Sequence, residues 1–306
     1  MPKFDMESIV ADIRRNIKDA RKQMSIGTGN DLRQLTEKDF IHLPEWWQTA
    51  TGTYGMPFGR IVLVAGGSDS GKTSLAIQAI KAALEQDCGV IYAETENKTT
   101  EKDFVAWGVD PTQIILVRSS VAEELAERLF DAWDGFKSRY PDAPLFVVVD
   151  SLGNMVSMRD VDIDLTEQSS QPGGKGKINR LLLNKMVSKM HEDNTAVLLI
   201  SYTYDNMGSP GKTNAGGNAL NFFSVLTYQT SRKSWLERTE KGQKIRYGAE
   251  VVWKLFKNHL NKGVGPKDIV FRITEAGIEY VDPDKTSAKG VKKSKTTEDT
   301  EAESID

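Results

Sequence analysis

Residues 66–73 read Gly-Gly-Ser-Asp-Ser-Gly-Lys-Thr and match the pattern GxxxxGK[ST] at every fixed position. The run 60–65 before them, apolar after Arg60, predicts a buried strand, and apolar residues at helical spacing over 75–84 predict a helix. A strand, a glycine-rich loop and a helix in this order direct backbone N–H groups and the positive end of a helix dipole at phosphates. The segment therefore predicts a chain that binds a nucleoside triphosphate.

Each residue type in this loop has a chemical task. The Lys72 ammonium is expected to reach the β- and γ-phosphates, and the Thr73 hydroxyl is expected to bind Mg²⁺. The residues expected to line the nucleotide are Gly66, Ser68, Asp69, Ser70, Gly71, Lys72, Thr73 and Ser74.

The composition is that of an ordinary globular protein. The 306 residues, 39% hydrophobic and 27% charged, suit one large domain or two modest ones. No apolar run approaches the ~20 residues of a membrane helix and no signal-peptide pattern opens the chain, so we expect no membrane partner. The single Cys88 excludes an internal disulfide and favours a cytoplasmic location. Because the net charge is −3, any DNA binding must come from local patches.

Strands and helices alternate from residue 60 to about residue 280, which predicts an α/β fold with a mostly parallel twisted sheet flanked by helices. After the first strand and helix, the expected strands are 90–93, 114–117, 145–149 and 196–200, and the expected helices are 123–140 and 178–191. The later segments 224–230, 248–256 and 269–273 alternate in polarity and favour an antiparallel edge.

The two ends of the chain differ from this core. Residues 4–24 predict an amphipathic helix with an apolar stripe at Met6, Ile9, Ile13 and Ile17. That stripe packs either on its own domain or on a neighbouring subunit. The last residues, 282–306, predict a disordered tail that is basic and then acidic. Either solvation alone explains this tail, or its acids compete with DNA for a basic surface.

Two acidic positions complete a nucleotide site. Asp150 ends the apolar strand 145–149, where a carboxylate lies beside the P-loop and can hold the water shell of Mg²⁺. Glu94 directly follows the strand 90–93 and is our first choice for the group that polarises the attacking water, with Glu96 in reserve.

Two long glycine-rich segments, 155–177 and 203–218, each follow a core strand on the side where α/β sheets bind ligands. Their lysines are expected to meet phosphates, and their methionines to wedge between bases. These residues are Lys175, Lys177 and Lys212, and Met155, Met158 and Met207.

Taken together, these runs resemble the RecA-type recombinases, over about residues 5–281. The resemblance lies in the P-loop, in Tyr92-Ala-Glu94, in the strand ending at Asp150-Ser151 and in the Thr-Asn-Ala-Gly-Gly-Asn-Ala-Leu-Asn-Phe-Phe run that ends at residue 223. The run 203–206 is similar to the phage UvsX branch of the family.

The resemblance implies a RecA-like ATPase core over 31–281, a polymerisation helix within 1–30 and a charged tail over 282–306. It implies an enzyme that hydrolyses ATP with Mg²⁺, forms a filament on single-stranded DNA and exchanges strands with a homologous duplex. Mediator and single-strand-binding proteins are its expected partners. The cytoplasm of a bacterium or of a phage-infected cell is its expected location.

Carried over residue by residue, the family pattern makes Lys72 and Glu94 catalytic, and Thr73 and Asp150 metal-side ligands. Lys257 is similar to one of two basic residues that reach a neighbouring subunit's ATP, while His259 stands where the family has a second Lys or Arg. Tyr202 stands at the family's Gln or His sensor of the γ-phosphate. The expected DNA contacts are Met158, Arg159, Lys175, Lys177, Met207, Lys212, Thr213, Asn214, Gly216, Gly217 and Asn218.

Two other functional classes share a P-loop core. One is a hexameric helicase of the same fold, or a KaiC- or RadA-like motor; the other is a P-loop kinase acting on a small molecule. The single cysteine excludes a zinc-binding cysteine cluster, and the sequence has no Arg-rich lid between the P-loop and the end of the core.

Overall fold

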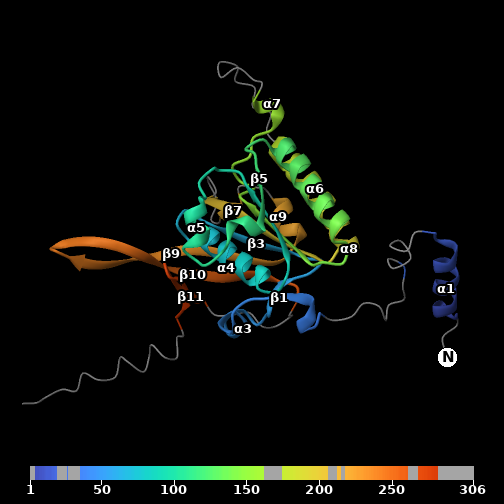
Figure 1. Cartoon of the computed structure of the whole chain (residues 1–306), viewed down its shortest axis with the longest axis horizontal. Helices are drawn as coiled ribbons and strands as arrows, with labels where there is room; N and C mark the ends of the chain where they lie inside the picture. Colours follow the sequence, from blue (N-terminus) through green and yellow to red (C-terminus); the bar gives the residue numbers. More distant parts are fainter. Residues whose placement is uncertain are drawn as a thin grey trace, which may run out of the picture.

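The computed structural model describes residues 4–18, 26, 35–161, 174–205, 212–214, 218–260 and 268–281. Within them, a large twisted sheet carries helices on both faces (Figure 1). The helices are α1 Met6–Asn16, α3 Glu45–Thr51, α4 Lys72–Leu84, α5 Glu101–Val105, α6 Ala122–Arg139, α7 Met158–Val161, α8 Gly174–Glu192 and α9 Asn218–Phe223, with 3₁₀ turns η2 Glu37–Asp39 and η3 Pro111–Gln113.

The strands of the large sheet lie in the order β12-β11-β10-β9-β3-β7-β6-β4-β5, with β8 paired to β7. Their bounds are β3 Ile61–Gly66, β4 Gly89–Glu94, β5 Ile114–Arg118, β6 Leu145–Asp150, β7 Thr195–Asp205, β8 Lys212–Asn214, β9 Ser224–Glu240, β10 Gln243–Asn258, β11 Ile269–Thr274 and β12 Gly277–Tyr280. A separate pair is formed by β1 Phe40–His42 and β2 Gly55–Pro57.

The strands from β9 through β3 to β5 run parallel, and β10, β11 and β12 continue the sheet antiparallel. This confirms the α/β sheet and the antiparallel edge that the sequence predicts. Every core strand and helix expected from the sequence is present, although most extend a few residues beyond the predicted bounds.

Two hydrophobic cores, one on each face, explain why the central strands are apolar throughout. Alternate residues of β3 point to opposite faces: Val62 and Val64 belong to the core under α4, whereas Ile61 and Leu63 belong to the core under α6 and α8. All four side chains are almost completely buried. A parallel strand covered on both faces requires this continuous apolar pattern.

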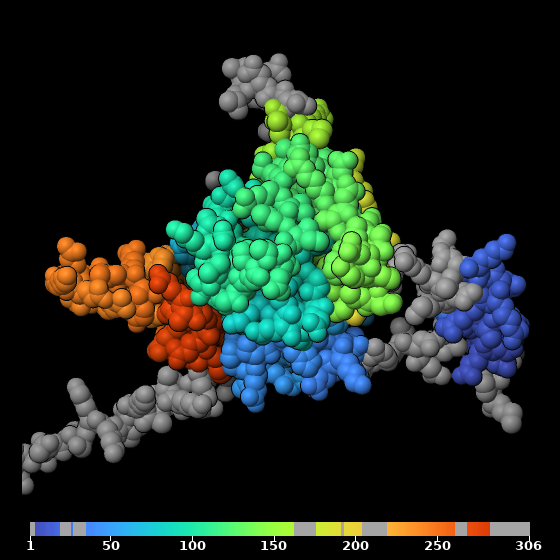
Figure 2. Space-filling model, in the orientation of Figure 1, coloured from blue at the N-terminus to red at the C-terminus, as the bar shows by residue number. Residues whose placement is uncertain are grey.

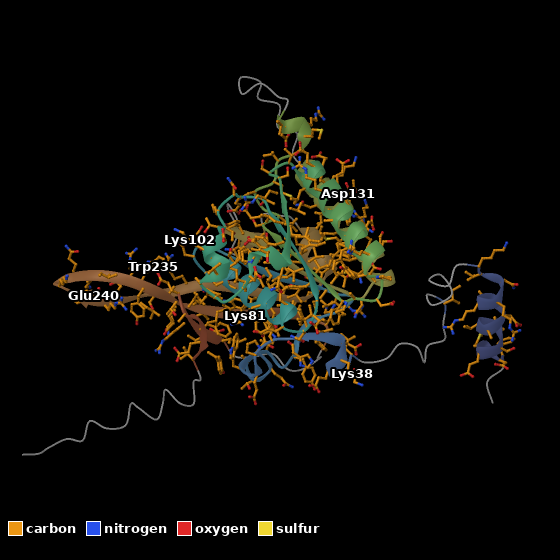
Figure 3. The ribbon with its side chains drawn as sticks, in the orientation of Figure 1. Lys38, Lys81, Lys102, Asp131, Trp235 and Glu240 are labelled. Carbon is orange, nitrogen blue, oxygen red and sulfur yellow. The ribbon has the colours of Figure 1, made fainter. Side chains whose placement is uncertain are left out.

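The antiparallel pair β9–β10 is much longer than the sequence predicts. It continues past the sheet as a projecting hairpin, drawn at the left of Figure 1, and turns at Lys241 and Gly242, both in the left-handed region. The guanidinium groups of Arg232 and Arg246 lie 4.2 and 4.9 Å from the centroid of the Trp235 ring. Figure 3 labels Trp235 on this hairpin. Such cation–π contacts stabilise a ribbon that has no core of its own.

Helix α1 is shorter than the predicted helix 4–24. It ends at Asn16, because Ile17 adopts an extended conformation, and residues 19–25 lie outside the described residues. The helix buries none of its residues and lies at the right-hand edge of the space-filling view in Figure 2. Met6, Ile9 and Ile13 are 54%, 47% and 41% exposed. The tail 282–306 also lies outside the described residues.

None of the helices in the described part of the chain is both long and apolar enough to cross a membrane.

Candidate nucleotide and DNA site

Four strand ends meet at one edge of the sheet. In the register of the parallel ladder, Gly66 of β3 pairs with Tyr202 of β7, and Glu94 of β4 pairs with Asp150 of β6. Because these strands are parallel neighbours in the order β3-β7-β6-β4, their carboxyl ends share this edge. We call this edge, with the P-loop, the nucleotide edge.

The P-loop begins and ends at glycines that tolerate no side chain. A Cβ at Gly66 would lie 2.1 Å from Thr230 Oγ1, and Gly71 has a φ of +79° with Ile273 Cδ1 only 2.2 Å from a Cβ position. Ser70 Oγ lies 2.8 Å from the Gly67 carbonyl oxygen and 2.6 Å from Thr230 Oγ1. The loop therefore packs tightly against β9 at the N-terminus of α4.

The remaining predicted loop residues face outward. Ser68 and Asp69 are exposed, and the Asp69 carboxylate lies 2.9 Å from an Arg232 guanidinium nitrogen. Ser74 is half-buried at the start of α4 and lines a neighbouring cavity.

Lys72 lies inside the loop rather than in solvent. Its side chain is buried, and Nζ donates a hydrogen bond to the Gly67 carbonyl oxygen at 2.6 Å. Burial lowers the pKa of Lys72 below its ordinary value, although Asp150 and Glu96 act in the opposite direction. A cation held by the loop in this way is the group that a phosphate chain requires.

Thr73 and Asp150 form the other half of the metal-side arrangement. Thr73 Oγ1 donates to Asp150 Oδ2 at 2.7 Å, and the buried Tyr92 hydroxyl donates to the same oxygen at 3.2 Å. Burial raises the pKa of Asp150, while these two hydrogen bonds act to lower it. A hydroxyl beside a carboxylate is the oxygen-donor chemistry that Mg²⁺ prefers, so these residues fit the ion.

Thr95 and Ser151 tie the ends of β4 and β6 together. The Thr95 hydroxyl donates to the Ser151 carbonyl at 2.8 Å and accepts from the Ser151 N–H at 3.0 Å. The Thr95 N–H donates to the Asp150 carbonyl at 3.0 Å. These bonds fix the two acidic strand ends relative to each other.

Glu94 is turned toward its own backbone. One carboxylate oxygen, Oε1, accepts from the N–H groups of Glu96 and Lys98 at 3.2 and 2.8 Å. The other, Oε2, lies 3.6 Å from Arg118 Nε and has no hydrogen-bond donor in the described residues. Glu94 therefore supports the turn that follows β4.

Glu96 points into the site from that turn. Oε1 accepts from Ser151 Oγ at 2.8 Å and from Asn154 Nδ2 at 2.7 Å, and Oε2 accepts from the Tyr202 hydroxyl at 3.1 Å and pairs with Lys98. Burial acts to raise the pKa of Glu96, but the hydrogen bonds from Lys98, Ser151 and Tyr202 outweigh it and the pKa lies below its ordinary value. Glu96 thus contacts the ends of β6 and β7, whereas Glu94 contacts the turn; the assignment of Glu94 as the group that polarises water stays a prediction.

Tyr202 connects this acid to the P-loop. Lys72 Nζ lies 4.3 Å from the centroid of the Tyr202 ring, and Lys98 Nζ lies 5.9 Å from the same centroid. Tyr202 also precedes the segment 203–218 directly. It therefore contacts both the predicted phosphate ligand and the acid, from the strand that leads into a predicted DNA loop.

A cavity of about 340 Å³ lies beside the start of α4. Trp107 contributes an aromatic wall, while Asp103 and Glu275 contribute carboxylates. The lining residues are Thr73, Ser74, Ile77, Lys98, Thr99, Asp103, Ala106, Trp107 and Glu275. The cavity has the size and chemistry for part of a nucleoside.

Lys257 and His259 do not lie at the nucleotide edge. Lys257 pairs in register with Thr227, which pairs with Leu63 near the start of β3, and His259 lies farther from the P-loop. Lys257 Nζ donates to the Asn221 and Ser224 carbonyls, at 2.6 Å each, where α9 ends. The two residues thus lie away from their own chain's P-loop.

The first predicted DNA segment, 155–177, contains more secondary structure than the sequence predicts. Residues 158–161 form α7 and residues 174–177 begin α8. Met158 and Arg159 are exposed on α7, and Lys177 is exposed on α8. Met155 is only 2% exposed, so the expectation that it inserts between bases is wrong: it belongs to the core under α6 and α8. Lys175 lies in α8, with a side chain outside the described ones.

The second predicted DNA segment, 203–218, is partly a ribbon. Strand β7 continues to Asp205 and pairs antiparallel with β8, Thr203 opposite Asn214 and Asp205 opposite Lys212. Thr213 lies between them in β8, and Asn218 begins α9. Met207, Gly216 and Gly217 lie outside the described residues. Both segments leave from the nucleotide edge, because β6 and β7 end there.

Several site residues have no recognisable sequence signal. The roles of Thr95, Lys98, Arg118 and Asn154 depend on partners that the sheet brings together. The only available clue is that Ser151 and Asn154 follow the acidic end of β6, where polar side chains are expected to face a ligand.

Comparisons with known proteins agree with this architecture. The family model of the RecA N-terminal domain matches residues 42–277. Among similar proteins, Protein RecA of Malacoplasma penetrans is 28% identical over 245 residues, which cover 76% of this chain and 70% of that protein. Protein RecA of Fusobacterium nucleatum is 25% identical over 255 residues, covering 79% of this chain and 64% of that protein.

Protein RecA of Aquifex aeolicus is 28% identical over 217 residues, covering 69% of this chain and 59% of that protein. The chain thus spans 59% to 70% of the length of these three curated relatives. Because the family model covers most of the chain, from the β1–β2 pair through the antiparallel edge, the chain belongs to the RecA family.

Proposed function

We propose that this chain is an ATP-dependent DNA recombinase, which assembles on single-stranded DNA and exchanges strands with a homologous duplex. The observation that carries the proposal is the convergence at the nucleotide edge of Lys72, Asp150, Glu96 and Tyr202. The two segments expected to hold DNA leave from the same strand ends. One edge therefore provides both a nucleotide site and the start of a DNA site.

In finer terms, we propose a member close to the phage UvsX-like branch, on the resemblance of residues 203–206. Such a protein would act in recombination, repair and recombination-dependent replication in the cytoplasm of a bacterial or infected cell. Mediator and single-strand-binding proteins are its proposed partners.

The P-loop supplies the nucleotide contacts. Lys72 binds the β- and γ-phosphates, and the N–H groups of residues 66–74 surround them. Thr73 would hold Mg²⁺, and Asp150 would lie on the same side of the site. The ion would neutralise charge on the β- and γ-phosphates. The cavity walled by Trp107 is proposed to receive the base.

Glu96 is proposed as the group that accepts the proton of the attacking water. The water oxygen forms a bond to the γ-phosphorus. At the same time the bond between the γ-phosphorus and the β–γ bridging oxygen breaks, and the electron pair of that bond stays on ADP. The released proton passes to the Glu96 carboxylate, and Ser151 and Asn154 hold this carboxylate in place. Glu94, the acid first expected in this role, fixes the turn that presents Glu96.

A second surface is proposed to complete the site of a neighbouring copy. Lys257 Nζ lies 3.4 Å from the Phe222 carbonyl oxygen, and Phe256 and His259 stand within two residues of Lys257 in the chain. The side chains of Phe222 and Phe256 are 79% and 62% exposed. We call these four residues the assembly face. Large exposed aromatic side chains beside a cation are typical of an interface core. The arrangement supports an ATP bound between two copies, with Lys257 supplied by the neighbour.

The organisation of the chain follows from these sites. We propose an oligomerisation segment over 1–30, an ATPase core over 31–281 and a charged tail over 282–306. The exposed stripe of α1 supports the first assignment, because an apolar helix face needs a partner and no described residue of the chain buries this one.

Electron microscopy with and without ATP and single-stranded DNA tests this function. Helical filaments that need both ligands are expected. Closed rings would favour a hexameric helicase or a related motor, and monomers would favour a P-loop kinase.

The rate of ATP hydrolysis tests the DNA coupling separately. We expect single-stranded DNA to stimulate hydrolysis, and replacement of residues 203–218 by a short Gly-Ser linker to remove the stimulation and most of the DNA affinity. Equal rates with and without DNA in the intact protein would contradict the proposal.

A further inference from the structure

Lys98 is a cation at the nucleotide edge that neither the P-loop pattern nor the assembly face includes. It follows Glu96 by two residues on the turn after β4. Its Nζ pairs with Glu96 Oε2, and it lies over the ring of Tyr202, as Lys72 does. The two ammonium groups therefore approach the same aromatic ring.

The backbone of Lys98 is held by a hydrogen bond, whereas its side chain is largely exposed. The Lys98 N–H donates to the Glu94 carboxylate at 2.8 Å, and Glu94 in turn contacts Arg118. The side chain is 70% exposed and lines the cavity that also contains Thr73 and Ser74. A flexible lysine anchored at its main chain can exchange one anionic partner for another at little cost.

The local charges give a reason for such an exchange. Glu96, Asp150, Lys72 and Lys98 nearly balance one another. A triphosphate adds several negative charges to this balance. At a partly buried site, an ammonium group moves toward the highest negative charge density, which is then on the γ-phosphate rather than on a single carboxylate.

We propose that Lys98 is a second catalytic cation of the nucleotide site, supplied by the same chain, which passes from the Glu96 carboxylate to the γ-phosphate when ATP binds. The proposal rests on the ATPase function proposed above. During attack by water, Lys98 stabilises the charge on the γ-phosphoryl oxygens. At the same time, Glu96 loses its ion pair and is free to accept the proton of the water.

This role also bears on the departure at His259. In the proposed assembly a neighbouring copy supplies Lys257 as a cation, whereas His259 stands where the family pattern has a second Lys or Arg. A lysine in the same chain would provide the missing charge without depending on the neighbour.

The test compares Lys98→Ala, Lys98→Arg and the control Lys102→Ala, an exposed lysine on α5 labelled in Figure 3. Binding of a fluorescent ATP analogue and single-turnover ATP hydrolysis on single-stranded DNA are measured for each. We expect Lys98→Ala to slow the chemical step by about 10- to 100-fold while nucleotide affinity changes by less than about fivefold. Lys98→Arg should recover most of the rate, and Lys102→Ala should match the wild type.

Two results would overturn the proposal. If Lys98→Ala hydrolyses ATP as fast as wild type or faster, Lys98 only occupies the Glu96 carboxylate and does not assist the reaction. If Lys98→Arg is as slow as Lys98→Ala although both melt like wild type, the charge is not what matters. A wild-type protein that does not hydrolyse ATP would instead refute the ATPase function itself.

Discussion

The nucleotide edge and the assembly face lie toward opposite ends of the same sheet and differ in how much of their side-chain surface is buried. At the nucleotide edge, Thr73 is hydrogen-bonded to Asp150, and Glu96 is hydrogen-bonded to two residues that follow β6. These short bonds form a largely buried network. At the assembly face, Phe222 and Phe256 are exposed. The difference indicates that the first region is pre-organised within one chain, whereas the second requires another surface.

This contrast explains what each region contributes. A buried polar network holds groups in fixed positions before the substrate binds, which lowers the barrier to chemistry. An exposed aromatic face contributes only on association, when its surface leaves water. The predictions below separate these contributions.

The largest effect is expected at the P-loop. Lys72→Ala removes the cation of the transferring phosphate, so ATP turnover should fall by about 10³-fold or more. The fold should persist, because Lys72 faces a ligand site rather than a hydrophobic core. Steady-state hydrolysis and a thermal melt check both points, with Lys81→Ala on the same helix as the control. Wild-type turnover in Lys72→Ala would refute the P-loop assignment.

A smaller effect on ATP hydrolysis is expected at Glu96. Glu96→Gln keeps the size of the side chain and removes the negative charge, so hydrolysis should fall by about 10²-fold or more while ATP binding persists. In Glu94→Gln the rate of hydrolysis should fall less, because the amide oxygen still accepts hydrogen bonds from the backbone N–H groups of the turn. If Glu94→Gln shows the larger loss, the acid first expected from the sequence is the correct one.

The assembly side is tested by the apolar stripe of α1. Replacing both Ile9 and Ile13 by Ser should raise the concentration needed for half-maximal assembly by at least about tenfold. Light scattering measures assembly, and Arg15→Ser on the same helix is the control. The melting temperature of the dilute monomer should not change. A lower melting temperature would show that the stripe packs on its own chain.

The smallest effect is expected away from both regions, at the base of the projecting hairpin. Glu250 lies 2.7 Å from Lys233 Nζ and 3.5 Å from Arg272 Nε. The hydrogen bond from Lys233 holds the pKa of Glu250 below its ordinary value. The pair therefore stabilises the fold above the unfolded pKa of about 4.3 and loses that stabilisation as the pH falls through the folded value.

Because Lys233 is 56% exposed, solvent screens the pair, and Glu250→Gln should cost less than about 1 kcal/mol at pH 7. Urea unfolding at pH 7 and at pH 3 measures the difference, which should shrink at the lower pH. ATP turnover should not change. A loss that grows toward low pH would contradict this account.

The sequence predicts the framework of the site well, because each part carries its own local signal. The glycines and Lys72 mark the P-loop, and the apolar run before Asp150 marks a buried strand with an acid at its end. Such patterns are set by burial and by backbone geometry over a few residues.

The choice between Glu94 and Glu96 cannot be made from such local patterns. Both acids lie near the end of β4, and the partners that each carboxylate contacts are decided by how the next turn folds. Glu94 Oε1 accepts two backbone N–H groups of that turn, and Ser151 and Tyr202 attract Glu96 across the sheet. None of these partners is near in sequence except the turn itself.

The sequence also predicts too little secondary structure in the β9–β10 hairpin and in the two DNA segments, for a related reason. Residues 231–247 are mostly polar and exposed, so they give little strand periodicity, and their pairing is set by the turn at Lys241 and Gly242. The pairing of 203–205 with 212–214 similarly depends on a partner strand rather than on a pattern in either segment.

The central claim, that one ATP is bound between two copies of the chain, is tested most directly by mixing two inactive variants. Lys72→Ala impairs the nucleotide edge and Lys257→Ala impairs the assembly face. In a randomly mixed filament, about one quarter of the interfaces would combine an intact nucleotide edge with an intact assembly face. ATP turnover on single-stranded DNA should therefore rise well above the sum of the two variants alone. Turnover equal to that sum, with mixed filaments confirmed by electron microscopy, would contradict the claim.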